Sequence, residues 1–371
     1  MNTKSLIINV IGFNDCCLSS RQANDTAGLR LQVACQTHDR GHCVARRQTI
    51  DLFAMSVHSV LQQLLGQPVT VRSQRPLSGG CISEVSLIDV VGLPAHALPT
   101  LDHGRSANEP DGAVSLVLKQ NDQAMLNNFQ CEAEGLAAIR SAGMTAPEII
   151  SCQAIGDRAY LLMQYLRPAA GGISERCEFD FGRDLATLHQ QTAGDQIGWH
   201  QDNYLGASLQ PNQPCETWAS FVAKRRIGFQ LKLAQNHGLL DHRLRRACQV
   251  IMQNMSQLLA GRDPVQCLLH GDLWSGNYLL TESGRTAVID PATYYGCREA
   301  EWGMIKWFGQ CGPAFTEGYE SVWPLPTGWQ IRSDIYLLYH QLNHLNLFGS
   351  GYDDLSLQTA QRILSGVRES L

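Results

Sequence analysis

The sequence LHGDLWSGN at residues 269–277, followed by Val288-Ile289-Asp290, places two carboxylates and one amide at a spacing used by phosphoryl-transfer enzymes. In protein kinases an aspartate accepts the proton of the attacking hydroxyl, and an asparagine shortly after it holds Mg²⁺. A second aspartate, which follows a short hairpin, also holds Mg²⁺. The corresponding residues here are Asp272, Asn277 and Asp290. The stretch therefore predicts a kinase-like active site.

This prediction depends on the context of Asp272, because His-Gly-Asp also occurs by chance and an isolated aspartate is most often a cap or a solvated loop residue. Here the strand-like residues 286–288 precede Asp290, so catalytic loop, hairpin and metal-binding aspartate occur in the expected order. The transition state spreads charge over phosphoryl oxygens, so positioning and cations carry most of the catalysis. Asp272 is expected to orient the acceptor hydroxyl, and Asn277 and Asp290 to bind Mg²⁺.

A lysine is expected to hold the nucleotide phosphates. Lys119 ends a predicted apolar strand at residues 114–118, from which its charge can reach the α- and β-phosphates. The alternative is an ordinary surface lysine at the end of a strand. A carboxylate must fix its position, and the helix predicted at about residues 123–141 offers Glu132 or Glu134, which point to different sides of that helix.

A glycine pair lies between two strands predicted within residues 69–91. Gly79 and Gly80, with Ser83 after them, lack the G-x-G-x-x-G spacing, and many hairpins contain paired glycines. Ahead of Lys119, however, such a turn lets backbone N–H groups approach phosphates without a Cβ in the way. We therefore expect these residues to cover the phosphates.

Trp274 lies two residues after the predicted base. A tryptophan in such a loop is either a packing residue or a platform for a substrate. We favour the substrate role, because an indole in a partly exposed loop combines a large apolar face with a polar edge.

Composition restricts the class of protein. The chain has 371 residues, of which 44% are hydrophobic and 17% charged, so it is expected to be globular and to form one two-lobed unit or two domains. A net charge of −5 without a long basic run argues against a nucleic-acid surface. The 13 cysteines show no regular framework and are expected to be reduced thiols. Without an apolar run long enough for a membrane span, and without a convincing signal peptide, the cytoplasm is the expected compartment.

The pattern along the chain predicts an α+β fold with two lobes. A small N-terminal lobe at residues 55–166 contains an antiparallel sheet and a helix, and a larger, mostly helical C-terminal lobe occupies residues 167–371. A helix begins after Ser56, and residues 92–112 form a long loop. Residues 1–54 are expected to be poorly ordered; they are either an extension or the result of an upstream start codon. They include Cys35, His38, His42 and Cys43, which are either an accidental cluster or a zinc site.

Beyond these residues, the chain resembles the fructosamine kinase and ketosamine 3-kinase family, a branch of the protein-kinase-like and aminoglycoside-phosphotransferase-like fold. The resemblance covers about residue 55 to the C-terminus. It is carried by GGCISE at 79–84, FQCEA at 129–133, residues 269–277, IDPATYYG at 289–296 and YHQLNHLNLFG at 339–349.

The resemblance implies ATP- and Mg²⁺-dependent phosphorylation of the 3-hydroxyl of a sugar joined through a ketoamine to a protein amine, which leads to deglycation. It implies that glycated proteins or free ketoamines are partners, and it selects Glu132 as the partner of Lys119. It also implies that Gln164, Tyr165 and Leu166 form the hinge that binds adenine. Cys81 falls at a cysteine that looks redox-sensitive in some relatives, so a redox-sensitive dimer is a further hypothesis.

Three departures from the family pattern leave the sugar open between fructosamines, ribulosamines and erythrulosamines. They are Gln164 in place of a glutamate, the length of the loop at 92–112, and Glu301 in the run EWGM; none is expected to touch the catalytic residues. Two other functions remain as alternatives. One is a kinase of another small alcohol, such as an aminoglycoside-like or choline-like acceptor, and the other is a catalytically silent nucleotide-binding protein of the same fold.

Overall fold

A computed structural model describes residues 30–33, 48–51, 55–77, 83–93, 112–308 and 311–369. The chain divides into two compact units, Met1–Val60 and Leu61–Leu371. In the first unit, β1 (Arg30–Val33) pairs with β2 (Gln48–Asp51) in antiparallel register. The predicted poor order of residues 1–54 concerns mainly residues outside those described, as does the cysteine and histidine cluster at 35–43.

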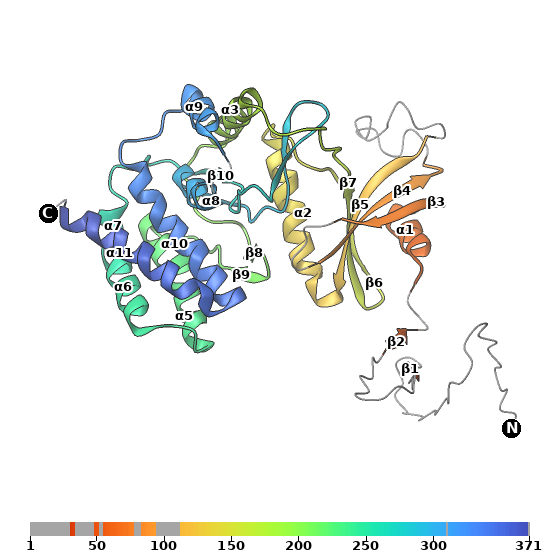
Figure 1. Ribbon diagram of the computed structural model, residues 1–371, viewed down its shortest axis with the longest axis horizontal. Coiled ribbons are helices and arrows are strands. Elements are labelled where there is room, and N and C mark those ends of the chain that lie inside the picture. Colours follow the sequence, from red (N-terminus) through yellow and green to blue (C-terminus); the bar gives the residue numbers. More distant parts are fainter. Residues whose placement is uncertain are drawn as a thin grey trace, which may run out of the picture. The chain divides into compact units, whose positions relative to one another are not determined.

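The second unit begins with an antiparallel sheet of five strands in the order β3-β4-β5-β7-β6 (Figure 1). The strands are β3 (Thr70–Pro76), β4 (Glu84–Val91), β5 (Val114–Asp122), β6 (Ile149–Ile155) and β7 (Arg158–Gln164). β7 is almost entirely buried and β5 is buried over most of Val114–Lys119, which fits their apolar runs, whereas β3 is an exposed edge. β5 extends three residues past Lys119, so this lysine lies within the strand and not at its end.

Helix α2 (Leu126–Ser141) covers one face of this sheet, after a short 3-10 helix at Gln123–Met125 (Figure 1). Phe129 packs on Ala159, Leu161 and Met163 of β7. Near its other end, Leu136 and Ile139 join a cluster of buried residues from the helical part of the chain. α2 is therefore held from both sides. Helix α1 (Val57–Leu65) begins as predicted after Ser56, whose Oγ accepts the Ser59 N–H at 3.2 Å.

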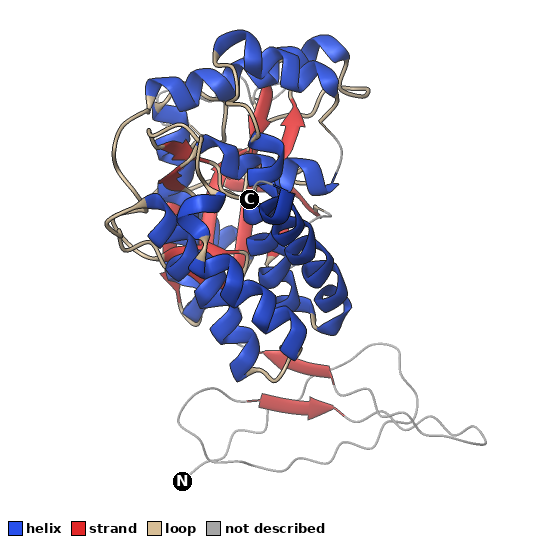
Figure 2. Ribbon diagram, turned by 90° about the vertical axis from the view of Figure 1, so that its left-hand side faces the viewer, coloured by secondary structure: helices blue, strands red, loops and turns tan. Residues whose placement is uncertain are grey.

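The remainder of the second unit is mostly helical (Figure 2). Its helices are α3 (Glu175–Gln191), α4 (Trp218–Phe221), α5 (Gly228–Asn236), α6 (His242–Gln253), α7 (Met255–Leu258), α8 (Glu301–Phe308), α9 (Pro313–Val322), α10 (Trp329–Phe348) and α11 (Asp353–Glu369). Helix α10 is the most deeply buried, and its residues pack with α4, α5, α6 and α11 in one core. The expected small mixed lobe and larger helical lobe are confirmed.

The helical stretch from Trp218 to Asn236 is interrupted. Between α4 and α5 the chain forms a π-helix at Val222–Ile227, which widens the turn. Within it, the buried Arg226 donates to the Pro211 carbonyl at 2.6 Å and to Asn212 Oδ1 at 2.8 Å. Hydrophobic periodicity did not reveal this wider turn, because apolar spacing carries no information on polar contacts such as those of Arg226.

Short strands carry the segments of greatest functional interest. β10 (Cys267–Leu269) pairs with β13 (Tyr294–Gly296), and β11 (Tyr278–Leu280) pairs with β12 (Thr286–Val288). A further hairpin joins β8 (Asn203–Leu205) to β9 (Ser208–Gln210). Within the described part of the chain, no helix combines the length and the apolar character that a membrane crossing requires.

His340 in α10 makes stability depend on pH. The pKa of His340 is lowered to about 3, mainly by burial and also by the charges of the neighbouring His344 and Arg226. The folded protein therefore keeps this ring neutral, whereas the unfolded chain binds a proton at about pH 6.5. The contribution of His340 to stability is fully present above that pH and is lost progressively as the pH falls below it.

Replacing His340 by leucine is expected to remove this linkage. Between pH 7 and pH 5 the variant should lose about 2 kcal/mol less of its unfolding free energy than the wild type loses. Urea titrations followed by tryptophan fluorescence would measure this difference. The exposed His237 provides the matched control, and His237→Leu should keep the wild-type pH dependence. An unchanged slope in His340→Leu would contradict the assignment.

Candidate active site

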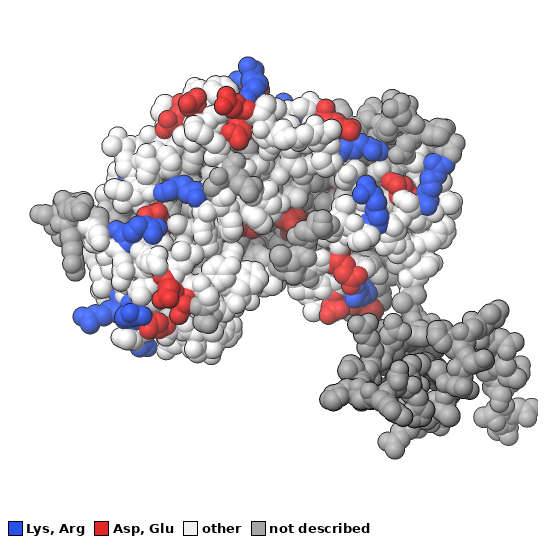
Figure 3. Space-filling view, in the orientation of Figure 1, with Lys and Arg blue, Asp and Glu red and all other residues white. Residues whose placement is uncertain are grey.

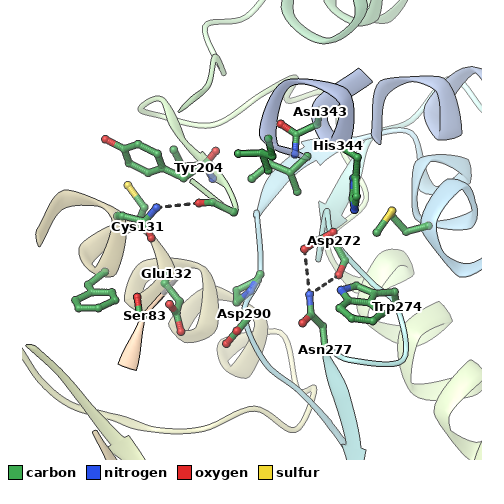
Figure 4. A pocket seen from close by; sticks show the side chains of 18 of the residues that line it. Ser83, Cys131, Glu132, Tyr204, Asp272, Trp274, Asn277, Asp290, Asn343 and His344 are labelled. Atoms are coloured by element: carbon green, nitrogen blue, oxygen red, sulfur yellow. Dashed lines mark hydrogen bonds between the residues drawn. The ribbon is translucent and has the colours of Figure 1, made fainter. Parts of the chain in front are cut away.

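A cavity of about 400 Å³ lies between the sheet and the helices of the second unit. Acidic side chains are visible in the recess there (Figure 3). Its lining includes seven of the residues predicted from the sequence, which come from distant parts of the chain. They are Ser83, Lys119, Glu132, Asp272, Trp274, Asn277 and Asp290. Figure 4 shows most of them around one space.

Lys119 is the positive centre of this cavity. Its Nζ lies 2.7 Å from Glu132 Oε1 and 2.5 Å from Asp290 Oδ1. The strand β5 supplies the lysine, α2 supplies Glu132, and the segment after β12 supplies Asp290. Glu134 points elsewhere, since its Oε2 accepts from Gln201 at 2.7 Å. The choice between the two glutamates is thus settled by which face of α2 meets the sheet.

Charge in this cluster is unbalanced, because one ammonium faces two carboxylates. Burial by itself would lower the pKa of Lys119, but Glu132 and Asp290 outweigh it and the pKa is raised. Burial raises the pKa of Glu132 to about 7; Lys119 opposes this increase and Asp290 adds to it. Lys119 therefore stays protonated between the two carboxylates.

Asp272 lies beside Asn277, whose Nδ2 donates to the Asp272 carbonyl at 2.8 Å and to Asp272 Oδ2 at 3.1 Å. Burial raises the pKa of Asp272 to about 7, and Asp290 raises it too, whereas the bond from Asn277 acts in the other direction. A carboxylate with a pKa near neutrality is well suited to accept a proton. Because the nitrogen of Asn277 is engaged with Asp272, its oxygen is left for another ligand (Figure 4).

His270 joins the two loops that carry these residues. Its Nδ1 accepts the Asp272 N–H at 3.3 Å, and its Nε2 donates to the carbonyl of Ile289, next to Asp290, at 2.9 Å. Burial lowers the pKa of His270, so the ring is neutral, as one accepting and one donating nitrogen require. A single imidazole thus fixes the spacing of Asp272 and Asp290.

Behind the loop, Glu301 is a buried carboxylate. As the sequence interpretation expected, it makes no hydrogen bond to the predicted catalytic side chains, but it contacts the backbone just before Asp272. Glu301 Oε1 accepts the backbone N–H of His270, and both of its oxygens lie 3.3 Å from the Gly271 nitrogen. It reaches them because α8 begins directly behind β10, a proximity that sequence spacing does not reveal.

The backbone itself is specialised at two positions. Gly271 has φ +82°, and a Cβ there would lie 2.2 Å from the Ala292 carbonyl oxygen. Asp290 has φ +53°, a left-handed conformation that few residues with a Cβ adopt. Such conformations persist where the surroundings impose them, and they occur often at functional sites.

An aromatic wall borders the cavity next to Asp272. Trp274 packs over Gly276, where a Cβ would lie 2.4 Å from the indole, and against Phe308 with ring centroids 4.9 Å apart. The rings of Trp307, Phe348 and Tyr352 surround His344, with centroids 4.7 to 5.3 Å from the centroid of the imidazole. Tyr352 also contacts the other two rings at centroid distances of 6.1 Å. Trp274 therefore both packs within the protein and lines the cavity.

Some predicted residues lie elsewhere. Gln164, Tyr165 and Leu166 are at and just after the end of β7 and do not line this cavity; Glu148 N–H donates to Gln164 Oε1 at 3.3 Å. Gly79, Gly80 and Cys81, like most of the loop at 92–112, lie outside the described residues.

Other cavity residues had no predicted role. Phe308, Asn343 and His344 line the cavity together with Asp272. For Asn343 and His344 the signal in the sequence was the tail YHQLNHLNLFG at 339–349, which carried the family resemblance without assigning a role to any of its residues; Phe308 had no such signal.

The fold and the site together define a phosphotransferase of the protein-kinase-like fold that transfers to an alcohol. Family comparison then makes the assignment specific. The model of the fructosamine kinase family matches residues 53–366, so the chain belongs to the fructosamine kinase family.

Known relatives agree with this membership. The chain is 34% identical to a probable ketoamine kinase of Synechocystis over 82% of this chain and 94% of the relative. It is 38% identical to a chloroplastic protein-ribulosamine 3-kinase of rice over 65% of this chain and 70% of the relative. A solved structure from Thermobifida fusca, assigned as a fructosamine-3-kinase, has a TM-score of 0.68 and 27% identity, and covers 84% of this chain and 99% of its own.

Glu301→Gln is expected to lower both stability and turnover, because the backbone N–H groups of His270 and Gly271 lose a charged acceptor. The free energy of unfolding should fall by about 2 kcal/mol, and turnover should fall more than the affinity for ATP. Urea titration and steady-state kinetics would measure these effects. Glu320→Gln, at an exposed position of α9, is the matched control. Wild-type turnover in Glu301→Gln would show that this carboxylate does not position the loop.

Proposed function

We propose that the protein is an ATP-dependent kinase that phosphorylates the 3-hydroxyl of ketosamines, sugars joined through a ketoamine to an amine. The observation that carries this proposal is the convergence of Lys119, Asp290 and Asp272 on one cavity that also has an aromatic wall. In this proposal Lys119 is the cation that binds phosphate and Asp272 is the proton acceptor, and both residues line the same cavity. The ketoamine kinase and ribulosamine kinase relatives support the class of acceptor.

In this proposal each residue has a distinct role. Lys119, held by Glu132, binds the α- and β-phosphates of ATP, with Ser83 and the glycines of the preceding turn beside them. Gln164, Tyr165 and Leu166 contact the adenine. Asp272 accepts the proton of the attacking hydroxyl as the phosphoryl group is transferred to its oxygen. Trp274 provides an apolar face for the acceptor.

The donor set also fits Mg²⁺, which prefers oxygen ligands. Asn277 and Asp290 would hold it, because the Asn277 oxygen accepts no hydrogen bond from the described residues and the Asp290 side chain is 44% exposed. Mg²⁺, when bound, neutralises charge that develops on the phosphoryl oxygens. The left-handed backbone of Asp290 presents its carboxylate to the cavity.

Transfer to the 3-hydroxyl makes the sugar adduct labile, so the proposed role is deglycation of protein amines. Glycated proteins or free ketoamines would be the partners. We further propose that the two lobes occupy residues 55–166 and 167–371, since β7 ends at Gln164. We also propose a cytoplasmic location. A kinase of another small alcohol is the second candidate, because the same fold and base would serve it.

The decisive experiment measures ATP consumption with ribuloselysine, erythruloselysine, fructoselysine and simple alcohols, with and without Mg²⁺. Turnover should require a ketoamine and Mg²⁺, and should fall by about 10²-fold or more in Asp272→Asn, because a positioned base is lost. Asp184→Asn on α3, outside the cavity, is the matched control. Full activity in Asp272→Asn would overturn the mechanism, and turnover of simple alcohols alone would favour the second candidate.

In the same assay Trp274→Ala should raise the KM of the acceptor more than that of ATP.

Regulation through Cys81 is a separate proposal, based on its place in the turn that is expected to cover the phosphates. An oxidised Cys81 would join two copies of the chain and reduce activity. Peroxide treatment followed by gel filtration and assay should therefore inhibit and dimerise the wild type but not Cys81→Ser. Equal oxidant sensitivity in the two proteins would refute it.

A further inference from the structure

Two neighbouring residues of α10, Asn343 and His344, face the same cavity as Asp272 (Figure 4). Asn343 is 2% exposed, and His344 points toward the region of Asp272 and Trp274. The roles of both depend on which of their atoms donate hydrogen bonds and which accept them. The surrounding network determines this for each residue.

A chain of three amides orients Asn343. Asn346 Nδ2 donates to the backbone carbonyls of Gln230 and Leu342, both at 3.0 Å, and to Gln230 Oε1 at 2.8 Å. Because carbonyl oxygens only accept hydrogen bonds, the Asn346 atom that contacts them must be the nitrogen, which donates. The Gln230 side-chain atom that contacts this nitrogen must then be the oxygen, which accepts. This leaves Gln230 Nε2 to donate to Asn343 Oδ1 at 3.1 Å.

The orientation of Asn343 follows from that bond. Its oxygen is occupied by Gln230, so its NH₂ group is the part of the amide available to the cavity. No described residue accepts a hydrogen bond from Asn343 Nδ2. Gln230 is completely buried, which excludes water as a competing partner on that side. Asn343 is therefore a donor at the cavity wall.

His344 has the opposite polarity. Its Nδ1 lies 2.9 Å from the His340 carbonyl, which can only accept, so Nδ1 carries the hydrogen and Nε2 is the acceptor. Burial lowers the pKa of His344, against the bond to His340, which favours the neutral ring. Trp307, with its centroid 4.7 Å away, packs edge to face on the imidazole and restricts its rotation.

We propose that Asn343 and His344 form a donor and acceptor pair that recognises the two oxygens on either side of the reacting hydroxyl. Asn343 Nδ2 donates to the keto oxygen at carbon 2, and His344 Nε2 accepts from the hydroxyl at carbon 4. Gln230 and Asn346 are positioning residues, which act through Asn343. The inference rests on the proposed function, and it specifies how that function selects ketosamines.

The chemical match is the reason for this assignment. A keto oxygen can only accept, so it requires a donor, whereas the hydroxyl at carbon 3 donates to Asp272. The hydroxyl at carbon 4 can donate, so an acceptor suits it. A site that hydrogen-bonds substrate oxygens also rejects analogues that lack them, because its own buried groups are then left unpaired.

Gln230→Glu tests the pair from a distance. An ionised carboxylate at position 230 still accepts from Asn346 but has no proton to donate, so Asn343 must turn its NH₂ group toward it and present its oxygen to the cavity; the assay is therefore run over a range of pH, because a protonated carboxyl could still donate to Asn343 Oδ1. The KM of the ketosamine should rise by about tenfold or more, while the KM of ATP changes less than about twofold. In an Asn343→Ala background the same substitution should add little, because its effect passes through Asn343.

Two further variants keep the test decisive. Gln230→Leu breaks the chain of amides without burying a charge, and should raise the KM of the ketosamine in the presence of Asn343 only. Gln266→Glu, another buried glutamine outside the cavity, controls for the cost of a buried carboxylate. It should lower stability without this selective change in KM.

The pair is refuted if Gln230→Glu or Gln230→Leu raises the KM by the same factor with and without Asn343, or if both KM values and the melting temperature shift together. Failure of the proposed function looks different, since the wild type itself would then not turn over any ketosamine. If the wild type turns over ketosamines but the effects of the substitutions at positions 230 and 343 on KM simply add, the donor and acceptor pair is refuted and the proposed function stands.

Discussion

The loop that carries Asp272 depends on a carboxylate buried behind it. Glu301 is 2% exposed and accepts backbone N–H groups of His270 and Gly271. A buried carboxylate is costly unless such donors surround it, and a loop with buried N–H groups is costly unless an acceptor meets them. Each group therefore requires the other. His270 also donates to the Ile289 carbonyl, so Asp272, the proposed proton acceptor, and Asp290, the predicted metal ligand, share one support.

Helix α2 provides the second support, because it connects the sheet to the helical part of the second unit. Asn127 Nδ2 donates to Tyr204 Oη at 3.1 Å, and Asn128 Nδ2 donates to the Gly206 carbonyl at 3.0 Å. Gly135 lets the helix approach Thr293 so closely that a Cβ would lie 2.7 Å from its Oγ1. These contacts hold the helix in the position at which Glu132 meets Lys119.

Sequence patterns predicted the secondary-structure elements and the motifs better than they predicted the contacts between residues. The central strands, α2 and the hairpin before Asp290 follow from apolar periodicity and turn residues, which are local properties. The extent of β5 beyond Lys119 and the π-helix around Arg226 do not, because pairing and a distant polar contact decide them. Composition left Glu132 and Glu134 equivalent; the family resemblance selected Glu132, and the packing of α2 brings this residue to Lys119.

By itself, the amino-acid sequence determined the chemistry class, since the spacing of Asp272, Asn277 and Asp290 has meaning without coordinates. It also determined the family, through motifs spread over the chain. Only the tertiary structure placed Glu301 behind the loop and Asn343 at the cavity that Asp272 lines, and only it showed which end of the Asn343 amide is available. The reason is physical: the direction of a hydrogen bond depends on the partners that folding supplies, and sequence spacing does not encode those partners.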